Sequence, residues 1–222
     1  MEMYGMTLNA IKTLLTDIRM TKYADIVDEC IDKWESEKNV DMFRLEFDPK
    51  GRFSDFRIDG QTLETPEKGF WTAQTFSALL AMNAQLADFQ KRGMKPDMNF
   101  IRSRFGAANE IMTAALCKDC GHREATAMDI DKYVSKIVIA KRIIKGLESG
   151  ELDKEVEELI NVTSDDIARE RRKAKLRLEN TGIVYTDVFG RLVSCPKCSG
   201  KNIAEGRLLR SLKENVFVPL SK

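Results

Sequence analysis

The chain has 222 residues, of which 43% are hydrophobic and 32% are charged, and its formal net charge is +1. These values are typical of a soluble globular protein with one large or two small domains. No apolar run approaches the roughly 20 residues that a membrane-spanning helix needs, and the start lacks a signal segment. We therefore expect a cytoplasmic protein with no membrane partner, in which the cysteines stay reduced.

The charges are distributed unevenly along the chain. Residues 1–100 carry a net charge of −4, and residues 101–222 carry +5. A basic second half is typical of a protein that binds a polyanion, although five charges alone do not establish such a partner.

Residues 1–95 are expected to form an α+β unit, a β-hairpin between helices. Apolar residues at helical spacing predict helices over about 8–18, after a cap at Thr7, and then over about 21–34 and 72–91. Between them, residues 43–47 and 52–58 read as two strands joined by the turn Asp48-Pro49-Lys50-Gly51, whose glycine accepts a positive φ. A second turn, Asp59-Gly60, ends this hairpin. Cys30 falls on an apolar helix stripe and is expected to be a buried packing residue.

A linker containing Pro96, over residues 94–99, is expected to separate this unit from a second domain over 100–222. The longest apolar pattern of that domain runs from Ile130 to Leu147. A helix this apolar is buried, either within its own domain or against a second subunit in a homodimer. The five positions that form its heptad seam are Tyr133, Ile137, Ala140, Ile144 and Leu147.

Four of the five cysteines form two Cys-x-x-Cys pairs. Each pair can fold into a tight knuckle that directs two sulfurs to one point. Two facing knuckles give the tetrahedral thiolate site that Zn²⁺ prefers, and a reducing compartment favours metal over disulfide. We therefore predict one zinc ion bound by Cys117, Cys120, Cys195 and Cys198.

Strands are expected on both sides of the first knuckle, over 111–116 and 122–126, and a hairpin over 183–193 is expected to deliver the second. Together with the four cysteines, these segments resemble the zinc-ribbon class, here with a helical insertion at about 129–180. The resemblance covers 111–126 and 183–212. Gly121 after the first knuckle is typical of the class, whereas Ser199-Gly200 departs from it. The resemblance implies a structural clip in a protein that binds nucleic acid or protein.

A site of four thiolates has no open coordination position, so we expect the metal to be structural and not catalytic. An iron–sulfur cluster also uses four thiolates and remains the alternative to zinc. His122, the only histidine, is an alternative ligand, but four thiolates already suffice, which favours a surface position beside the knuckle. Gly121 precedes His122 and so breaks the Cys-x-x-Cys-His motif of haem attachment.

Residues 169–177 form the most basic segment of the chain, with six Lys or Arg residues among nine. Two interpretations stay open: a solvated helix face that complements the helix dipole, or a set of phosphate contacts. The ribbon surface adds three further cations. The candidate nucleic-acid-binding residues are Arg169, Arg171, Arg172, Lys173, Lys175, Arg177, Arg191, Lys197 and Lys201.

No phosphate-binding loop, nucleophile elbow or His-Glu-x-x-His motif is present, and a single histidine leaves little general-base chemistry, so an enzyme is not expected. The leading hypothesis is a regulatory or adaptor protein that binds DNA or RNA. The alternative is a protein–protein interaction or immunity-type accessory module that self-associates through helix 130–147.

Overall fold

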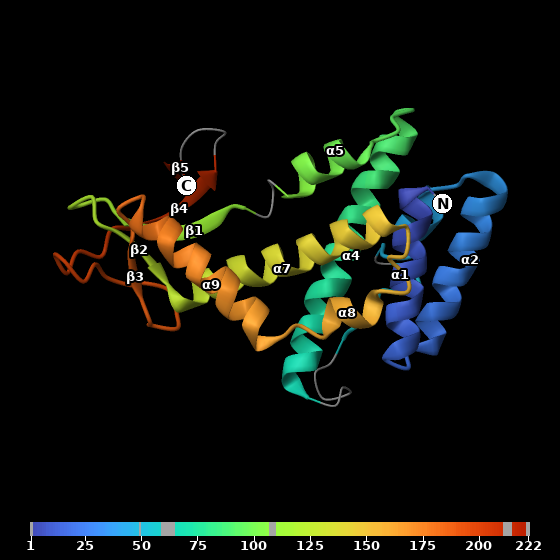
Figure 1. Cartoon of the computed structure of the whole chain (residues 1–222), viewed down its shortest axis with the longest axis horizontal. Coiled ribbons are helices and arrows are strands. Elements are labelled where there is room, and N and C mark those ends of the chain that lie inside the picture. Colours follow the sequence, from blue (N-terminus) through green and yellow to red (C-terminus); the bar gives the residue numbers. More distant parts are fainter. Residues whose placement is uncertain (1, 49, 59–64, 107–109, 211–214, 221–222) are drawn as a thin grey trace. The chain divides into compact units, whose positions relative to one another are not determined.

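The computed structural model describes residues 2–48, 50–58, 65–106, 110–210 and 215–220. Within these ranges the chain is a mixed α+β protein with eight α-helices, one π-helical turn and one five-stranded sheet (Figure 1). None of the described helices is both long and apolar enough to cross a membrane.

The chain divides into two compact units in a pattern that differs from the expected 1–95 and 100–222. Unit 1 comprises residues 1–105 and 139–162, and unit 2 comprises residues 106–138 and 163–222. The long helix α7 (Ala127–Ser149) contributes residues to both units. About half of the expected helical insertion therefore groups with the N-terminal residues.

Among the described residues of unit 1, all regular secondary structure is helical. Its main helices are α1 (Met3–Asp17), α2 (Thr21–Glu37) and α4 (Pro66–Lys91), and its short helices are α3 (Asp41–Leu45), α5 (Met98–Ile101), the π-helical turn η2 (Arg102–Gly106) and α8 (Val156–Ile160). The apolar stripe of α1 is fully buried, as its periodicity predicts.

Thr7 does not cap α1, which begins four residues earlier. Its side chain is fully buried, and its hydroxyl donates to the Tyr4 carbonyl oxygen at 2.7 Å. The same hydroxyl accepts a hydrogen bond from Asn83 Nδ2 of α4 at 2.8 Å. This pair satisfies the buried polar groups where α1 and α4 meet.

The predicted β-hairpin of unit 1 is wrong. Phe43 lies in α3, and residues 46–48 and 50–55 form turns and bends without strand pairing. The alternating aromatic residues instead gather in a cluster in which Phe47 and Phe53 stack with ring centroids 4.4 Å apart and Phe56 lies 4.8 Å from Phe76 of α4. A lone two-stranded hairpin is marginally stable, and aromatic burial against helices competes with it. The second turn, Asp59-Gly60, lies outside the described residues.

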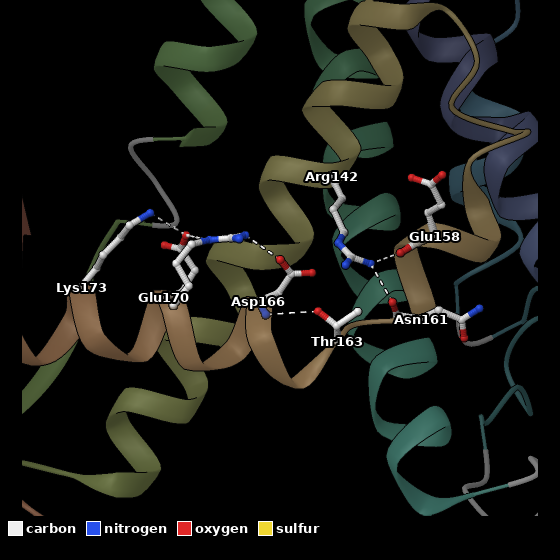
Figure 2. A network of polar contacts seen from close by, with 8 residues as sticks. Arg142, Glu158, Asn161, Thr163, Asp166, Glu170 and Lys173 are labelled. Carbon is white, nitrogen blue, oxygen red and sulfur yellow. Dashed lines mark hydrogen bonds and ion pairs between the residues drawn. The ribbon is translucent and has the colours of Figure 1, made fainter.

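The C-terminal end of α8 is held by a cation from α7 within unit 1. Arg142 donates to the carbonyl oxygens of Glu158 and Asn161, the latter at 3.2 Å (Figure 2). The last carbonyl groups of a helix have no intrahelical partner, so a guanidinium there satisfies them and complements the helix dipole.

Unit 2 is built on the sheet, whose strands are β1 (Met112–Cys117), β2 (Arg123–Thr126), β3 (Val184–Thr186), β4 (Ile203–Arg210) and β5 (Asn215–Pro219). The strand order is β3-β2-β1-β4-β5, and only the β2–β3 pair is parallel. By register, Met112 and Leu208 lie on one face, which is buried, and Ala115 and Glu205 lie on the other, which is more open.

The expected hairpin over 183–193 is also wrong, because β3 pairs with β2 and residues 190–193 are not in a strand. The second knuckle is instead reached through an irregular loop over residues 187–194. This loop is anchored where the Ala127 amide donates to the Val188 carbonyl oxygen at 3.2 Å. Phe189 in the loop is 74% exposed.

Helix α9 (Ser164–Glu179) carries the basic segment of unit 2. Thr163 caps it, because its hydroxyl accepts a hydrogen bond from the Asp166 amide at 3.2 Å (Figure 2). A similar device begins α7, where Asp129 Oδ2 accepts from the Thr126 amide at 2.9 Å. Both helices of unit 2 therefore start at a threonine followed by a carboxylate three residues later.

The close packing around Gly51 leads to a prediction about the turn between Phe47 and Phe53. This glycine lacks a positive φ, but a Cβ there would lie 2.3 Å from the Glu46 carbonyl oxygen and 2.4 Å from that of Leu45. Since backbone atoms cannot easily move away, Gly51→Ala should destabilise the protein by roughly 1–3 kcal/mol. Thermal denaturation followed by circular dichroism measures this. Gly106→Ala, where a Cβ meets nothing within 4 Å, is the control, and equal melting of both variants would contradict the close approach.

Candidate metal centre

The sulfurs of the two Cys-x-x-Cys pairs come together in unit 2. The Sγ atoms of Cys117, Cys120, Cys195 and Cys198 all lie within 4.8 Å of one another. Cys117 and Cys198 are 3.6 Å apart, as are Cys120 and Cys195. Four sulfurs placed about 2.3 Å from a tetrahedral zinc ion would be separated by about 3.8 Å. The cluster therefore fits one metal ion, and its soft sulfur donors suit zinc.

The two knuckles share one backbone structure. In the first, the Cys117 amide donates to the His122 carbonyl oxygen at 2.8 Å and the Gly121 amide donates to the Cys117 carbonyl oxygen at 2.9 Å. The second repeats both bonds at 2.8 Å, from Cys195 to Gly200 and from Ser199 back to Cys195. Two stretches with different sequences thus form the same ligand-presenting turn.

This turn requires a left-handed residue after its second cysteine. Gly121 adopts φ +73° there, and Ser199 adopts φ +59° at the equivalent position. A non-glycine residue in this conformation is strained. The second knuckle therefore differs from the first in the type of this residue but not in its backbone.

Polar contacts join the first knuckle to the strand that follows the second. The Lys118 amide donates to the Asn202 carbonyl oxygen at 2.9 Å, and Asn202 Nδ2 donates to Asp119 Oδ1 at 3.2 Å. Gly200 fits closely between them, because a Cβ there would lie 2.2 Å from Asp119 Oδ2 and 3.2 Å from Cys198 Sγ. These contacts fix the relative position of the two sulfur pairs.

The sulfurs also shift one another's ionisation. Burial raises the pKa of Cys195, but the backbone amides of Cys198 and Lys197 and neighbouring thiols outweigh it and lower the pKa to about 7. For Cys198, the Gly200 amide lowers the pKa, but neighbouring sulfurs of Cys120 and Cys117 outweigh it and raise the pKa to about 12. Crowded thiolates repel one another, and a bound divalent cation would remove this repulsion.

Among the described residues, neither His122 nor Cys30 belongs to this sulfur cluster. His122 Nε2 contacts Glu124 Oε2 at 2.8 Å, and within the described residues the group of possible metal ligands contains only the four cysteines. Cys30 is buried in the apolar stripe of α2, and burial raises the pKa of its thiol to about 12. It is therefore a packing residue, as its spacing predicts.

The cations of α9 are largely engaged within unit 2. Arg169 Nη2 pairs with Asp166 at 2.6 Å, Lys173 pairs with the buried Glu170 at 3.0 Å (Figure 2), and Arg171 pairs with Asp131 at 2.6 Å. Lys175 lies 4.0 Å from the centroid of the Tyr185 ring. Of the six predicted residues of this helix, Arg172 alone has neither an ion pair nor a ring contact within the described ranges.

Arg177 holds the sheet of unit 2 together. Its half-buried guanidinium donates to Asn215 Oδ1 at 2.7 Å, to the Glu110 carbonyl oxygen, and at 3.4 Å to both Tyr133 Oη and the Leu208 carbonyl oxygen. With these donors engaged, the side chain has little capacity left for a phosphate.

The cations beside the knuckles are arranged differently. Arg191, Lys197 and Lys201 are exposed, and their side chains make no hydrogen bond or ion pair with any described residue. Lys118 in the first knuckle shares this environment and was missed by sequence reasoning. Its position between two ligating cysteines, one place before the position that corresponds to Lys197 in the second knuckle, was the available signal. We name Lys118, Arg191, Lys197 and Lys201 the knuckle surface.

Replacing one ligand should release the metal and loosen unit 2. We expect one zinc per chain by elemental analysis in the parent protein and in Cys30→Ser, and a loss of zinc and of cooperative unfolding in Cys198→Ser. Cys30→Ser should lower the free energy of unfolding by only about 1 kcal/mol. A parent protein without zinc or iron would refute the site, and equal damage in both variants would refute the ranking.

Exchanging the left-handed residues of the knuckles should have opposite effects. Ser199→Gly removes roughly 1–2 kcal/mol of strain but adds roughly 0.5–1 kcal/mol of unfolded-chain entropy, so it should stabilise the protein slightly. Gly121→Ser should destabilise it, since its new side chain meets no atom that could compensate. Thermal melting of the zinc-loaded variants checks both signs. A destabilising Ser199→Gly would mean that the serine side chain has a separate role.

Comparison of the chain with protein-family models, with curated proteins and with solved structures found no match. The similarity to zinc ribbons therefore rests on the four cysteines, on the shared backbone of the two knuckles, and on the strands β1, β2 and β4 that adjoin them.

Proposed function

We propose that the protein is a regulatory or adaptor protein that binds nucleic acid through the knuckle surface, next to one structural zinc ion. The metal in this proposal is held by Cys117, Cys120, Cys195 and Cys198 and has no open position for a substrate. Its role is to fix the two knuckles, and thereby the cations beside them, in one geometry. An iron–sulfur cluster would instead give visible absorption, which separates the two metals.

One observation carries this proposal: the four cations of the knuckle surface have no internal partner among the described residues, whereas most cations of α9 have one. A cation that is already paired must break that pair before it contacts a phosphate. An unpaired exposed cation gains the full benefit of counterion release. The proposed interface is therefore centred on the knuckles, and α9 has a supporting role at most.

The charges of the two units support the same choice. Unit 2 contains 17 Lys or Arg and 12 Asp or Glu residues, a net charge of +5, whereas unit 1 has a net charge of −4. A polyanion is attracted to the unit of positive sign, so the binding face belongs to unit 2 in this proposal.

The competing hypothesis, self-association through helix 130–147, has less apolar surface available. Ile137, Ala140 and Leu147 are buried within the chain, and Tyr133 and Ile144 are half-buried. Little of the seam is left for a second subunit to cover. We therefore place nucleic-acid binding ahead of a homodimer or another protein partner.

Salt dependence tests the proposed interface. A variant with Lys118→Ala, Lys197→Ala and Lys201→Ala should bind DNA and RNA of any sequence more weakly than the parent. Each lost phosphate contact should reduce the slope of log affinity against log salt by roughly 0.7–0.9. Fluorescence anisotropy with labelled strands between about 50 and 200 mM salt measures this slope.

The matched control replaces three cations of α9 that have internal partners, Arg169, Arg171 and Lys173, with alanine. Both triple variants lose the same charge, so a general electrostatic effect would weaken them equally. The proposal expects a clearly larger slope change for the knuckle variant at unchanged zinc content. A larger effect of the α9 variant would move the interface to that helix, and a parent that binds no nucleic acid at low salt would end the proposal.

A further inference from the structure

A cavity of about 380 Å³ opens on unit 2 beside the sulfur cluster. Ala115 of β1 and Ile203 and Glu205 of β4 line it, and the register places these three residues on the open face of the sheet. Ile203 is the direct strand partner of the metal ligand Cys117, so the cavity adjoins the first knuckle. Its volume falls within the range of small-ligand sites.

The walls and rim of the cavity differ in chemistry. Met128, Leu192 and Leu220 contribute apolar surface, whereas Lys132, Arg191 and Glu205 contribute charge. These three charged side chains are exposed and have no hydrogen-bond or ion-pair partner among the described residues. A ligand that matches these residues has apolar surface, a hydrogen-bond donor for the carboxylate and a negative group for the cations.

The remaining acid of the cavity is not available to a ligand. Asp129 Oδ1 accepts from Thr113 Oγ1, and its Oδ2 accepts from the amide and hydroxyl of Thr126, each at 2.9 Å. Both carboxylate oxygens of Asp129 are therefore engaged in hydrogen bonds near the start of α7. Glu205 is left as the carboxylate that faces a ligand in this cavity.

We infer that the cavity receives one unpaired base of a single-stranded nucleic acid, with guanine favoured over the other bases. This inference rests on the proposed function, and Arg191 connects the two, because it belongs both to the knuckle surface and to the rim of the cavity. A strand whose phosphates contact the knuckle surface passes the opening. Its neighbouring phosphate then lies near Arg191 or Lys132.

The base must be unpaired because its hydrogen-bonding edge has to face Glu205. Within a duplex that edge is occupied by the partner strand, and extruding the base costs unpairing and unstacking energy. Unpaired bases of single strands are free to enter such a pocket and to be read at their Watson–Crick edge. The protein should therefore bind single strands more tightly than duplexes of the same length.

Guanine is favoured because a carboxylate only accepts hydrogen bonds. The Watson–Crick edge of guanine presents two adjacent donors, N1–H and the N2 amino group, which match the two oxygens of Glu205. Adenine and cytosine place an acceptor nitrogen beside their amino group, and uracil and thymine place carbonyl oxygens on both sides of one N–H. Only guanine avoids repulsion between acceptors.

The exposed loop before the second knuckle supports a single strand as the ligand. Phe189 is two residues from Arg191, and this aromatic residue is 74% exposed. Base stacking on exposed aromatic rings beside cations is a general means of binding single strands without regard to sequence. Phe189 is placed to stack on a base next to the one in the cavity.

The test compares uridine or thymidine strands of about 12 nucleotides, with and without one central guanine, in anisotropy assays with the full chain. The parent should favour the guanine strand by roughly tenfold, as a bidentate contact allows. Glu205→Gln, whose amide opposes one guanine donor with its own, should abolish this preference, and by removing a negative charge it should not weaken binding to the plain strand. Glu179→Gln, an exposed acid of α9 outside the cavity, is the control and should retain the preference.

A second variant, Ala115→Leu, fills the cavity from its floor. It should also remove the guanine preference, while its zinc content and melting confirm that it folds. Competition with free guanosine monophosphate distinguishes a pocket for a nucleotide within a strand from a pocket for the free nucleotide. Only in the second case would the free nucleotide displace the guanine strand at a concentration similar to that of the strand itself. Failure of the parent to bind any nucleic acid refutes the proposed function. Binding with no guanine preference, equal affinity for duplex and single strand, or a preference that persists in Glu205→Gln refutes the cavity proposal alone.

Discussion

The convergence of four sulfurs is the interaction on which the organisation of unit 2 depends. It brings together two segments separated by 74 residues, and the loop that it closes contains α7, α8 and α9. Closing such a loop without a strong local contact carries a large entropic cost, which metal coordination can offset. The strand pairing of β1 with β4 starts at Cys117 and Ile203, directly beside the cluster. The four-cysteine cluster thus lies at one end of the β1–β4 pairing.

The parts of the structure that the sequence predicts well are those governed by local chemistry. The Cys-x-x-Cys spacing indicated the ligand set, and helical periodicity indicated the buried stripe of α1. The hairpin over 43–58 failed because alternating aromatic residues satisfy either a strand face or a packed cluster. Which of the two forms depends on partners from distant segments, such as Phe76 of α4. Periodicity does not contain that information.

The basic segment shows the same limit for the candidate interface. Its sequence counts six cations but does not show that Arg171 pairs with Asp131 from α7 or that Arg177 holds strands β4 and β5. Both partners are far away in the chain. The four cations of the knuckle surface form no dense run in the sequence, yet none of them has an internal partner among the described residues. The density of Lys and Arg along a sequence therefore shows how many cations a segment contains, but not how many of them are free of internal partners and able to contact a ligand.

The interleaving of the two units along the chain has a consequence for synthesis of the protein. Unit 1 is completed only by residues 139–162, from which Val156 and Leu159 are buried and the Leu159 carbonyl oxygen accepts from Thr75 of α4 at 3.4 Å. The first helices must therefore leave the ribosome well before the segment that completes their core. Unit 2 is completed later still, after Cys198 has left the ribosome. Neither unit can be obtained by cutting the chain once, and a nascent chain exposes apolar surface that chaperones can bind until the last third is made.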